Sequence, residues 1–110
     1  MNWKLVRDRI PEIMQAAGTT PTFRTINESE RLAWLLEKLR EEVSELVAQP
    51  CLEECADVLE VVVTIARHLG HTEDKLRAAT SDKAERRGNF DRGVLLKIAG
   101  REDDPGWTGP

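Results

Sequence analysis

Apolar residues recur with helical spacing in two consecutive stretches of the chain. The first stretch predicts a helix of about four turns that ends before Pro50, and the second predicts a helix from Cys51 to Leu69. Because the connection at Pro50 is short, the two helices should pack as antiparallel neighbours. The apolar positions are Leu32, Leu35, Leu36, Leu39, Val43, Leu46 and Val47 in the first stretch, and Leu52, Cys55, Leu59, Val62, Ala66 and Leu69 in the second.

The second of these helices carries a further apolar line, formed by Val58, Val61 and Ile65, with Glu54 on the same side. A helix with more than one apolar face is normally covered on more than one side. This predicts that a second subunit completes the fold. Residues 61–65 are also rich in β-branched side chains, so a strand is the competing interpretation, but the length and the 3.6-residue period favour a helix.

The N-terminal region predicts a short helix within residues 3–16. Pro11 suits its first turn, and Gly18 suits the position after its last turn. Residues 21–26 have β character and predict an isolated strand or an extended arm. Residues 89–99 predict a short strand that could pair with residues 21–26.

Polar residues and glycines mark the ends of the longer helices. Asn27 or Ser29 can cap the first one, and Gly70 can end the second. Thr72, followed by two acids, starts a third helix that runs to about Arg87.

These elements predict an all-α fold. We expect an antiparallel helical bundle of about three to four helices, with short extended arms at the ends, completed by dimerisation. The helical domain should cover residues 1–100, followed by a polar tail over residues 101–110.

Composition narrows the class of function. The chain has 110 residues and a formal net charge of −4, which disfavours general nucleic-acid binding. Tyrosine is absent and Phe occurs only twice, so an aromatic platform for bases has little to build from. The N-terminus lacks the apolar core of a signal peptide, and the run 58–69 is too short and too charged to span a bilayer. We therefore expect a cytoplasmic protein with no membrane and no stable nucleic-acid partner.

Two acidic pairs within the predicted helices are the strongest indication of chemistry. Glu42 and Glu45 lie three residues apart, as do Glu54 and Asp57, so each pair occupies one side of a helix. The turn at Pro50 should bring the two pairs together. Oxygen ligands of this kind suit Mg²⁺, Mn²⁺ or Ca²⁺. Mg²⁺, with Mn²⁺ as an alternative, can bind nucleotide phosphates and activate water. For either pair alone, a solvated surface is the more common explanation.

Basic residues near the end of the third predicted helix could complete such a site. Lys83, Arg86 and Arg87 are the candidate phosphate-binding residues. An equally good explanation is that cations at a helix C-terminus interact favourably with the helix dipole.

Cys51 and Cys55, followed by His68 and His71, superficially resemble a zinc-finger spacing. The gap between the histidines is too short for that motif, and the cysteines lie at the start of a helical pattern. The favoured interpretation is two reduced thiols packed as small hydrophobic side chains.

Taken together, these motifs resemble the MazG-like all-α NTP pyrophosphatase superfamily, which includes phosphoribosyl-ATP pyrophosphohydrolases. The residues that carry the superfamily pattern are Glu41, Glu42, Glu45, Glu54 and Asp57. Residues 4–13, 53–61 and 83–90 look like three blocks of a small "house-cleaning" branch, and the resemblance covers about residues 3–98. The chain departs from the superfamily in a shorter gap between the two acidic motifs and in Asn89, which replaces a second glycine.

The resemblance implies Mg²⁺-dependent cleavage between the α- and β-phosphates of NTPs or dNTPs, non-standard ones in particular, to a nucleoside monophosphate and pyrophosphate. The implied metal ligands are Glu42, Glu45, Glu54 and Asp57. The implied catalytic residues are Glu41, Glu42 and Glu45, and the implied phosphate contacts are Lys83 and Arg87. The resemblance also implies a homodimer or a dimer-based tetramer.

Two alternative functions stay open at this point. One is a non-catalytic, dimeric helical module that binds a nucleotide or a partner helix, since the doubly apolar helix requires no working carboxylates. The other is hydrolysis of phosphoribosyl-ATP, although residues 4–13 favour the house-cleaning branch. Trp3 and Trp34 could stack on a base, but a core or interface role is the more common one for tryptophan. The base and sugar preference does not follow from the sequence.

Overall fold

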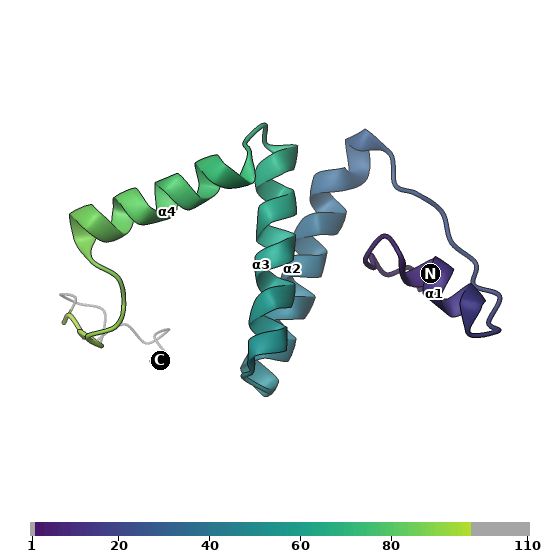
Figure 1. The fold of residues 1–110 in the computed structure, drawn as a ribbon, viewed down its shortest axis with the longest axis horizontal. Coiled ribbons are helices and arrows are strands. Elements are labelled where there is room, and N and C mark those ends of the chain that lie inside the picture. The colour runs from purple at the N-terminus through teal and green to yellow at the C-terminus, as the bar shows by residue number, and fades with distance from the viewer. Residues whose placement is uncertain (1, 98–110) are drawn as a thin grey trace, which may run out of the picture. The chain divides into compact units, whose positions relative to one another are not determined.

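In a computed structural model, which describes residues 2–97, the chain forms helices and no strands over that range. The elements are α1 (Ile10–Ala16), the short 3-10 helix η1 (Glu28–Glu30), α2 (Arg31–Ala48), α3 (Leu52–His68) and α4 (Glu73–Arg87) (Figure 1). The chain divides into two compact units, Met1–Ala78 and Ala79–Pro110, and each is described by itself. The predicted all-α class is confirmed for the described residues.

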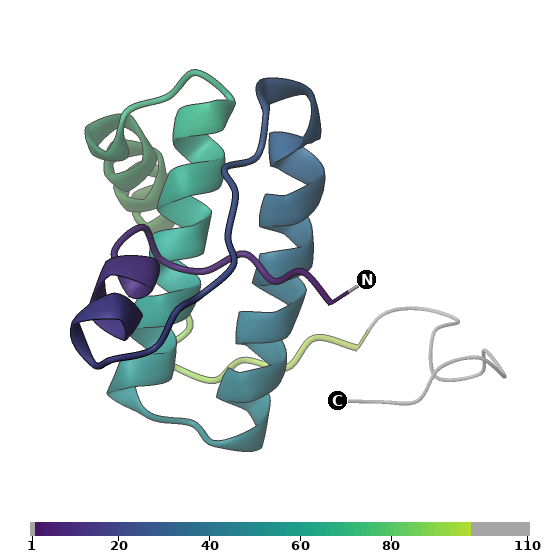
Figure 2. The same cartoon turned by 90° about the vertical axis from the view of Figure 1, so that its right-hand side faces the viewer.

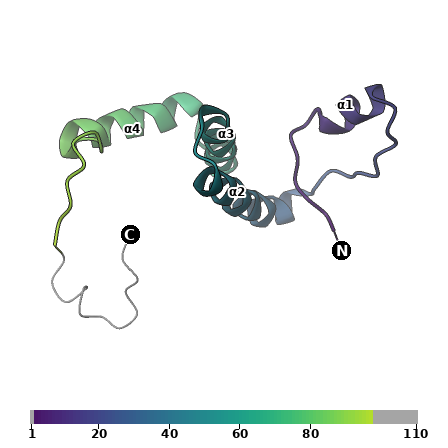
Figure 3. The same cartoon turned by 90° about the horizontal axis from the view of Figure 1, so that it is seen from below.

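The first unit is organised around the antiparallel pair α2 and α3, which lie side by side along their lengths (Figures 2 and 3). The predicted break at Pro50 is confirmed, because α2 ends at Ala48 and α3 begins at Leu52. Because the connection between them is short, the second helix packs antiparallel against the first.

The face of α3 that packs inward coincides only in part with the predicted main stripe. Val61, Val63 and Ala66 are buried, together with Leu35 of α2, whereas Leu52, Leu59 and Leu69 are exposed. Val61 of the further apolar line therefore lies in the core, and of the main stripe Ala66 is buried while Leu52, Leu59 and Leu69 are not. Periodicity indicates how many apolar faces a helix has, but the partner helix decides which of them is covered.

Local signals set the helix ends as expected. Asn27 and Glu30 form a capping box at η1, in which the Asn27 side chain accepts from the Glu30 N–H and the Glu30 carboxylate accepts from the Asn27 N–H. Thr72 Oγ1 accepts the Lys75 N–H at 3.1 Å and so caps α4. Asn27 therefore fills the capping role for which Ser29 was the alternative.

Gly70 ends α3 in the left-handed conformation that glycine adopts most readily, with φ of 94°. The Gly70 N–H donates to the Arg67 carbonyl and the His71 N–H donates to the Ala66 carbonyl, both at 2.9 Å. This pair of bonds is a Schellman motif, which satisfies carbonyls that the end of the helix leaves without partners.

The predicted strands are not found. Residues 21–26 and 89–97 have no regular secondary structure, so the expected pairing between them is wrong for the described part of the chain. A strand needs a neighbour to satisfy its backbone groups, and a short β-rich segment does not supply one. Residues 98 and 99 and the predicted tail, 101–110, lie outside the described residues.

The segment before α1 runs across α2 and α3 on one face of the pair (Figure 2). Arg24 lies over the ring of Trp3, with its Cζ 5.5 Å from the ring centroid, so this tryptophan has a cation–π partner within its own unit. Across residues 2–97, no helix is both long and apolar enough to cross a membrane.

Candidate metal centre

Glu42 lies on the face of α2 that meets α3 and is only 6% exposed. Its Oε1 is 2.9 Å from the Nζ of Lys38, one helical turn earlier. Its Oε2 is buried and has no hydrogen-bond partner among the described residues. A buried, unpartnered carboxylate oxygen costs free energy, and one way to recover it is to bind a cation.

Glu54 and Asp57 approach Glu42 from the first two turns of α3. Their three-residue spacing places them on one side of that helix. Each of the three residues offers a carboxylate oxygen that lies within 4.8 Å of the other two. Glu54 Oε2, like Glu42 Oε2, is buried without a hydrogen-bond partner in the described chain. We call Glu42, Glu54 and Asp57 the carboxylate triad.

The triad has the ligand chemistry of a hard divalent cation. Its donors are carboxylate oxygens only, which suits Mg²⁺ or Mn²⁺ better than a metal that prefers thiolates. Three carboxylates so close together also repel one another unless positive charge lies between them. The residues therefore fit Mg²⁺, and the two buried oxygens without partners distinguish this group from a solvated acidic surface.

Glu54 shows the electrostatic strain of the triad. Desolvation raises the pKa of its carboxyl group above the usual value. The negative charges of Glu45, Asp57 and Glu42, together with a hydrogen bond to Glu45, shift the pKa in the same direction. A cation bound at the triad would act in the opposite sense, because it favours the ionised form.

The four carboxylates of the acidic pairs differ in exposure. Glu42 is the least exposed, because it lies in the seam between α2 and α3, while Glu54 is half-buried near the turn. Glu45, which the resemblance implies as a metal ligand, is exposed and lies outside the triad. It remains close enough to Glu54 to hydrogen-bond with it, so it borders the site.

Glu41, a predicted catalytic residue, is half-buried and held by two lysines. Its Oε1 is 2.8 Å from Lys4 Nζ and 3.4 Å from Lys38 Nζ. The hydrogen bond from Lys4 lowers the pKa of Glu41, and the charge of Lys38 contributes in the same direction. A carboxylate with a lowered pKa is a weaker base, so the geometry favours Glu41 as the partner of these lysines rather than as the group that accepts a proton.

The predicted phosphate-binding residues Lys83, Arg86 and Arg87 are exposed in the last turns of α4 and belong to the second unit. Arg86 pairs with Asp82 one turn earlier, with Nη2 3.0 Å from Oδ2. The carboxylate triad is built entirely by the first unit.

Among known proteins, an uncharacterized protein of Mycolicibacterium smegmatis (strain ATCC 700084 / mc(2)155) is similar to part of the chain. The two are 56% identical over 45 residues, which make up 41% of this chain and 46% of the relative. The matched segment thus spans about half the length of that relative. No protein-family model matches the chain, and no solved structure matches it.

Three cationic side chains lie beside the triad, and the sequence patterns did not predict them as part of the site. Arg7 Nη2 donates to Asp57 Oδ1 at 2.7 Å, Lys4 pairs with Glu41, and Lys38 pairs with Glu42. Lys38 could have been found, since it lies four residues before Glu42 on the same helix face. No such helical spacing relates Lys4 to Glu41 or Arg7 to Asp57, because the two residues of each pair lie far apart in the sequence.

The cysteines are free, as expected, but they are not packed as small hydrophobic side chains. Cys51 and Cys55 are both exposed at the start of α3. The expected packing is wrong, because neither side chain is covered by another part of the described chain.

Proposed function

We propose that this protein is a Mg²⁺-dependent nucleotide pyrophosphohydrolase. It would cleave the bond between the α- and β-phosphates of NTPs or dNTPs, non-standard ones in particular, to a nucleoside monophosphate and pyrophosphate in the cytoplasm. The observation that carries the proposal is the buried Glu42 Oε2, which has no hydrogen-bond partner in the described chain and lies beside two further carboxylates. The resemblance to the MazG-like superfamily supports the same chemistry.

In this proposal each acidic residue has a defined part. Glu42, Glu54 and Asp57 hold Mg²⁺, which supplies charge neutralisation for the phosphates and a more acidic bound water. Glu45 lies next to Glu54 and is exposed, so it can take the proton of the attacking water or add a further ligand. The water attacks phosphorus directly, without a covalent enzyme intermediate.

The outer phosphates need cations. Lys83, Arg86 and Arg87 of α4 remain candidates for this role, and the superfamily resemblance implies Lys83 and Arg87 among them. Membership of the MazG-like superfamily is itself part of the proposal, and so is the larger bundle of three to four helices.

The test is release of pyrophosphate from a panel of standard and non-standard nucleotides in the presence of Mg²⁺, with phosphoribosyl-ATP as one substrate. We expect Glu42→Gln and Asp57→Asn to lower kcat/KM at least about a hundredfold, as removing a metal-centred interaction typically does. Glu53→Gln is the matched control, because Glu53 is an exposed neighbour of Glu54 that lies outside the triad. Equal activity in the parent and all three variants would contradict the assignment of the carboxylate triad as the active site.

A second candidate is a non-catalytic module that binds a partner helix. The observation in its favour is the apolar surface left on both long helices, including Val47 and Leu52, which are 74% and 85% exposed. Calorimetric titration with Mg²⁺ and a non-hydrolysable nucleotide separates the two candidates. The module would bind no Mg²⁺ at the triad and release no pyrophosphate.

We also propose that the protein forms a homodimer or a dimer-based tetramer. Apolar side chains that one subunit leaves in water are commonly covered by another subunit. The exposed apolar positions on α2 are Leu36, Val43 and Val47, and those on α3 and directly after its end are Leu52, Leu59 and Leu69.

A further inference from the structure

The segment before α1 brings two cations to carboxylates on different helices. Lys4 Nζ lies 2.8 Å from Glu41 Oε1 on α2, and Arg7 Nη2 lies 2.7 Å from Asp57 Oδ1 on α3. Because Asp57 belongs to the carboxylate triad, Arg7 touches the candidate cation site directly. Lys4 approaches the same site from the α2 side, where the charges of Glu45 and Glu42 also act on it.

Both side chains remain open to an incoming ligand. The side chain of Lys4 is 60% exposed and that of Arg7 is 56% exposed, so neither is enclosed by the rest of its unit. Exposed ion pairs contribute little to stability, at most about 1 kcal/mol each, and are readily exchanged for other partners. Lys38 differs, because it is mostly buried and held between Glu41 and Glu42.

The charge balance explains how these cations could change partners. Five carboxylates surround the site and three cations oppose them. The carboxylates are Glu41, Glu42, Glu45, Glu54 and Asp57, and the cations are Lys4, Arg7 and Lys38. A divalent cation at the triad would neutralise the charge of Asp57 and weaken its hold on Arg7. The guanidinium would then be free for another anion at the same rim, and its planar donor set matches a phosphate group.

We propose that Lys4 and Arg7 are the phosphate-binding rim of the site and contact the polyphosphate of a metal-bound nucleotide. The proposal rests on the proposed function and adds to it a ligand-binding role for the N-terminal segment. It places cations for the phosphates within the same compact unit as the carboxylate triad. In the absence of metal and nucleotide, the two side chains hold the carboxylates instead.

The test uses inorganic pyrophosphate as the probe, titrated calorimetrically into the full chain at saturating Mg²⁺. Arg7→Ala should weaken pyrophosphate binding about tenfold or more, since it removes a charge-assisted hydrogen bond, and Lys4→Ala should weaken it several-fold. Arg7→Lys should fall between Arg7→Ala and the parent because it keeps the charge but loses the planar donor set.

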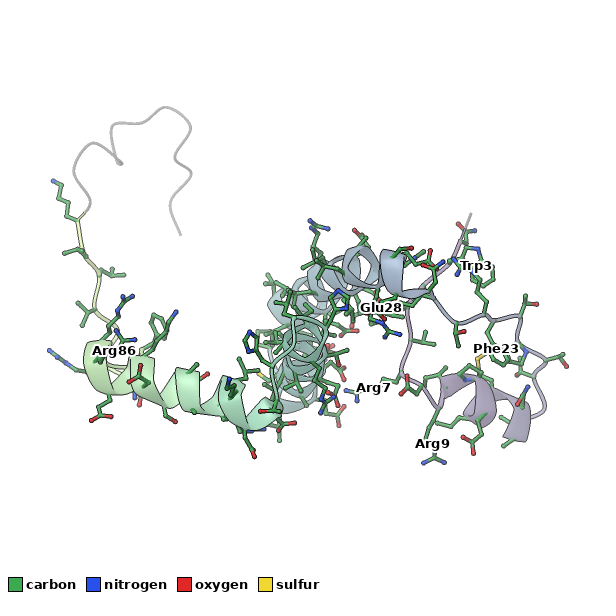
Figure 4. The ribbon with its side chains drawn as sticks, turned by 90° about the horizontal axis from the view of Figure 1, so that it is seen from above. Trp3, Arg7, Arg9, Phe23, Glu28 and Arg86 are labelled. Carbon is green, nitrogen blue, oxygen red and sulfur yellow. The ribbon has the colours of Figure 1, made fainter. Side chains whose placement is uncertain are left out.

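Arg9→Ala is the matched control. Arg9 lies in the same segment, is exposed and pairs with Glu12, and it points away from α2 and α3 while Arg7 points toward them (Figure 4). Its removal should change pyrophosphate affinity less than about twofold, because an exposed charge away from the site contributes little. An equal loss in Arg9→Ala and Arg7→Ala would mean that general positive charge, and not the rim, attracts the anion.

Mn²⁺ binding without pyrophosphate, followed by electron paramagnetic resonance, separates the rim from a merely structural role. Arg7→Ala should bind Mn²⁺ as tightly as the parent or more tightly, because a competing cation has been removed. Parallel losses of Mn²⁺ and pyrophosphate affinity would show that Arg7 only orients Asp57, which would overturn the proposal. Circular dichroism of each variant confirms that the helices are retained.

The outcomes also separate this inference from the proposed function. If the parent binds Mg²⁺ and pyrophosphate through Arg7 but hydrolyses no nucleotide, the proposed function fails and the rim stands. If the parent hydrolyses nucleotides and Arg7→Ala leaves both KM and pyrophosphate affinity unchanged, the rim fails and the proposed function stands. Failure of the parent to bind pyrophosphate with Mg²⁺ present would overturn the rim.

Discussion

At the scale of single residues, Glu42 has two oxygens in different situations. Oε1 is paired with Lys38 at 2.9 Å, whereas the buried Oε2 has no hydrogen-bond partner in the described chain. A cation that satisfies the second oxygen binds only the folded state, so it should stabilise the protein.

We therefore predict that Mg²⁺ or Mn²⁺ raises the thermal stability of the parent and that Glu42→Gln loses most of this gain. At a hundredfold excess over Kd the stabilisation should be about 2.7 kcal/mol. The measurement is thermal unfolding with and without the metal. Glu37→Gln serves as the control, because Glu37 is exposed on the same helix and pairs with Arg40 at the surface. An undiminished metal response in Glu42→Gln would contradict the assignment.

Glu54 gives a pH-dependent prediction for the metal-free protein. Its pKa is raised in the folded state, so the folded state holds this proton more tightly than the unfolded state does. Stability should then fall as pH rises from the ordinary carboxyl pKa, about 4.3, through the raised value. Glu54→Gln removes that loss and should be more stable than the parent at neutral pH.

The measurement is thermal unfolding of both proteins over a pH series in a chelating buffer. The advantage of Glu54→Gln should shrink as pH falls and disappear below the ordinary carboxyl range, where the parent is protonated in both states. An advantage that stays constant with pH would show that burial of the charge is not its origin. With Mg²⁺ present the order should reverse, since the variant lacks a ligand.

At the scale of elements, the Schellman motif after α3 depends on the left-handed backbone of Gly70. A Cβ at this position would meet no atom within 4 Å, so a substitution there costs backbone strain and no steric clash with neighbours. We predict that Gly70→Ala destabilises the protein by about 1 kcal/mol and that Gly70→Asn costs less, because Asn tolerates the left-handed region. Denaturant unfolding measures both values, and equal costs for the two substitutions would argue against a conformational cause.

At the scale of the whole molecule, the apolar surface of the helix pair leads to a prediction about assembly. Leu36, Val43 and Val47 share a helical spacing on α2 and are all exposed. If this stripe is the interface of a homo-oligomer, Val47→Glu should shift the protein toward the monomer, because a charge at an apolar interface must be desolvated. Sedimentation velocity at several concentrations measures the shift.

Ser44→Glu is the matched control for that prediction, because it adds the same charge to an exposed position of α2 without removing apolar surface. A parent that is monomeric at high concentration would remove the proposed oligomer. An oligomer that withstands both substitutions would place the interface on another face.

Much of the local structure could be predicted because the interactions that set it span only a few residues. The α2–α3 turn followed from Pro50, and the cap at Asn27 followed from its side-chain chemistry. The proposed strand at 21–26 failed because β character in a short segment creates no partner for its backbone. The structure brings Glu42, Glu54 and Asp57 together, as the turn at Pro50 predicted for the two acidic pairs, and leaves Glu45 exposed at their border.

By itself, the sequence determined the helical class, the α2–α3 turn and the presence of acidic residues on both helices, since periodicity, caps and spacing are properties of neighbouring residues. Only the tertiary structure decided that Val61 and Val63 pack inward while Leu59 does not, and that Glu42 is the buried carboxylate. It also decided that Arg7 meets Asp57, fifty residues further along the chain. Such contacts depend on how one helix face is rotated against another and on the path of the N-terminal segment. No short-range pattern in the sequence records either of them.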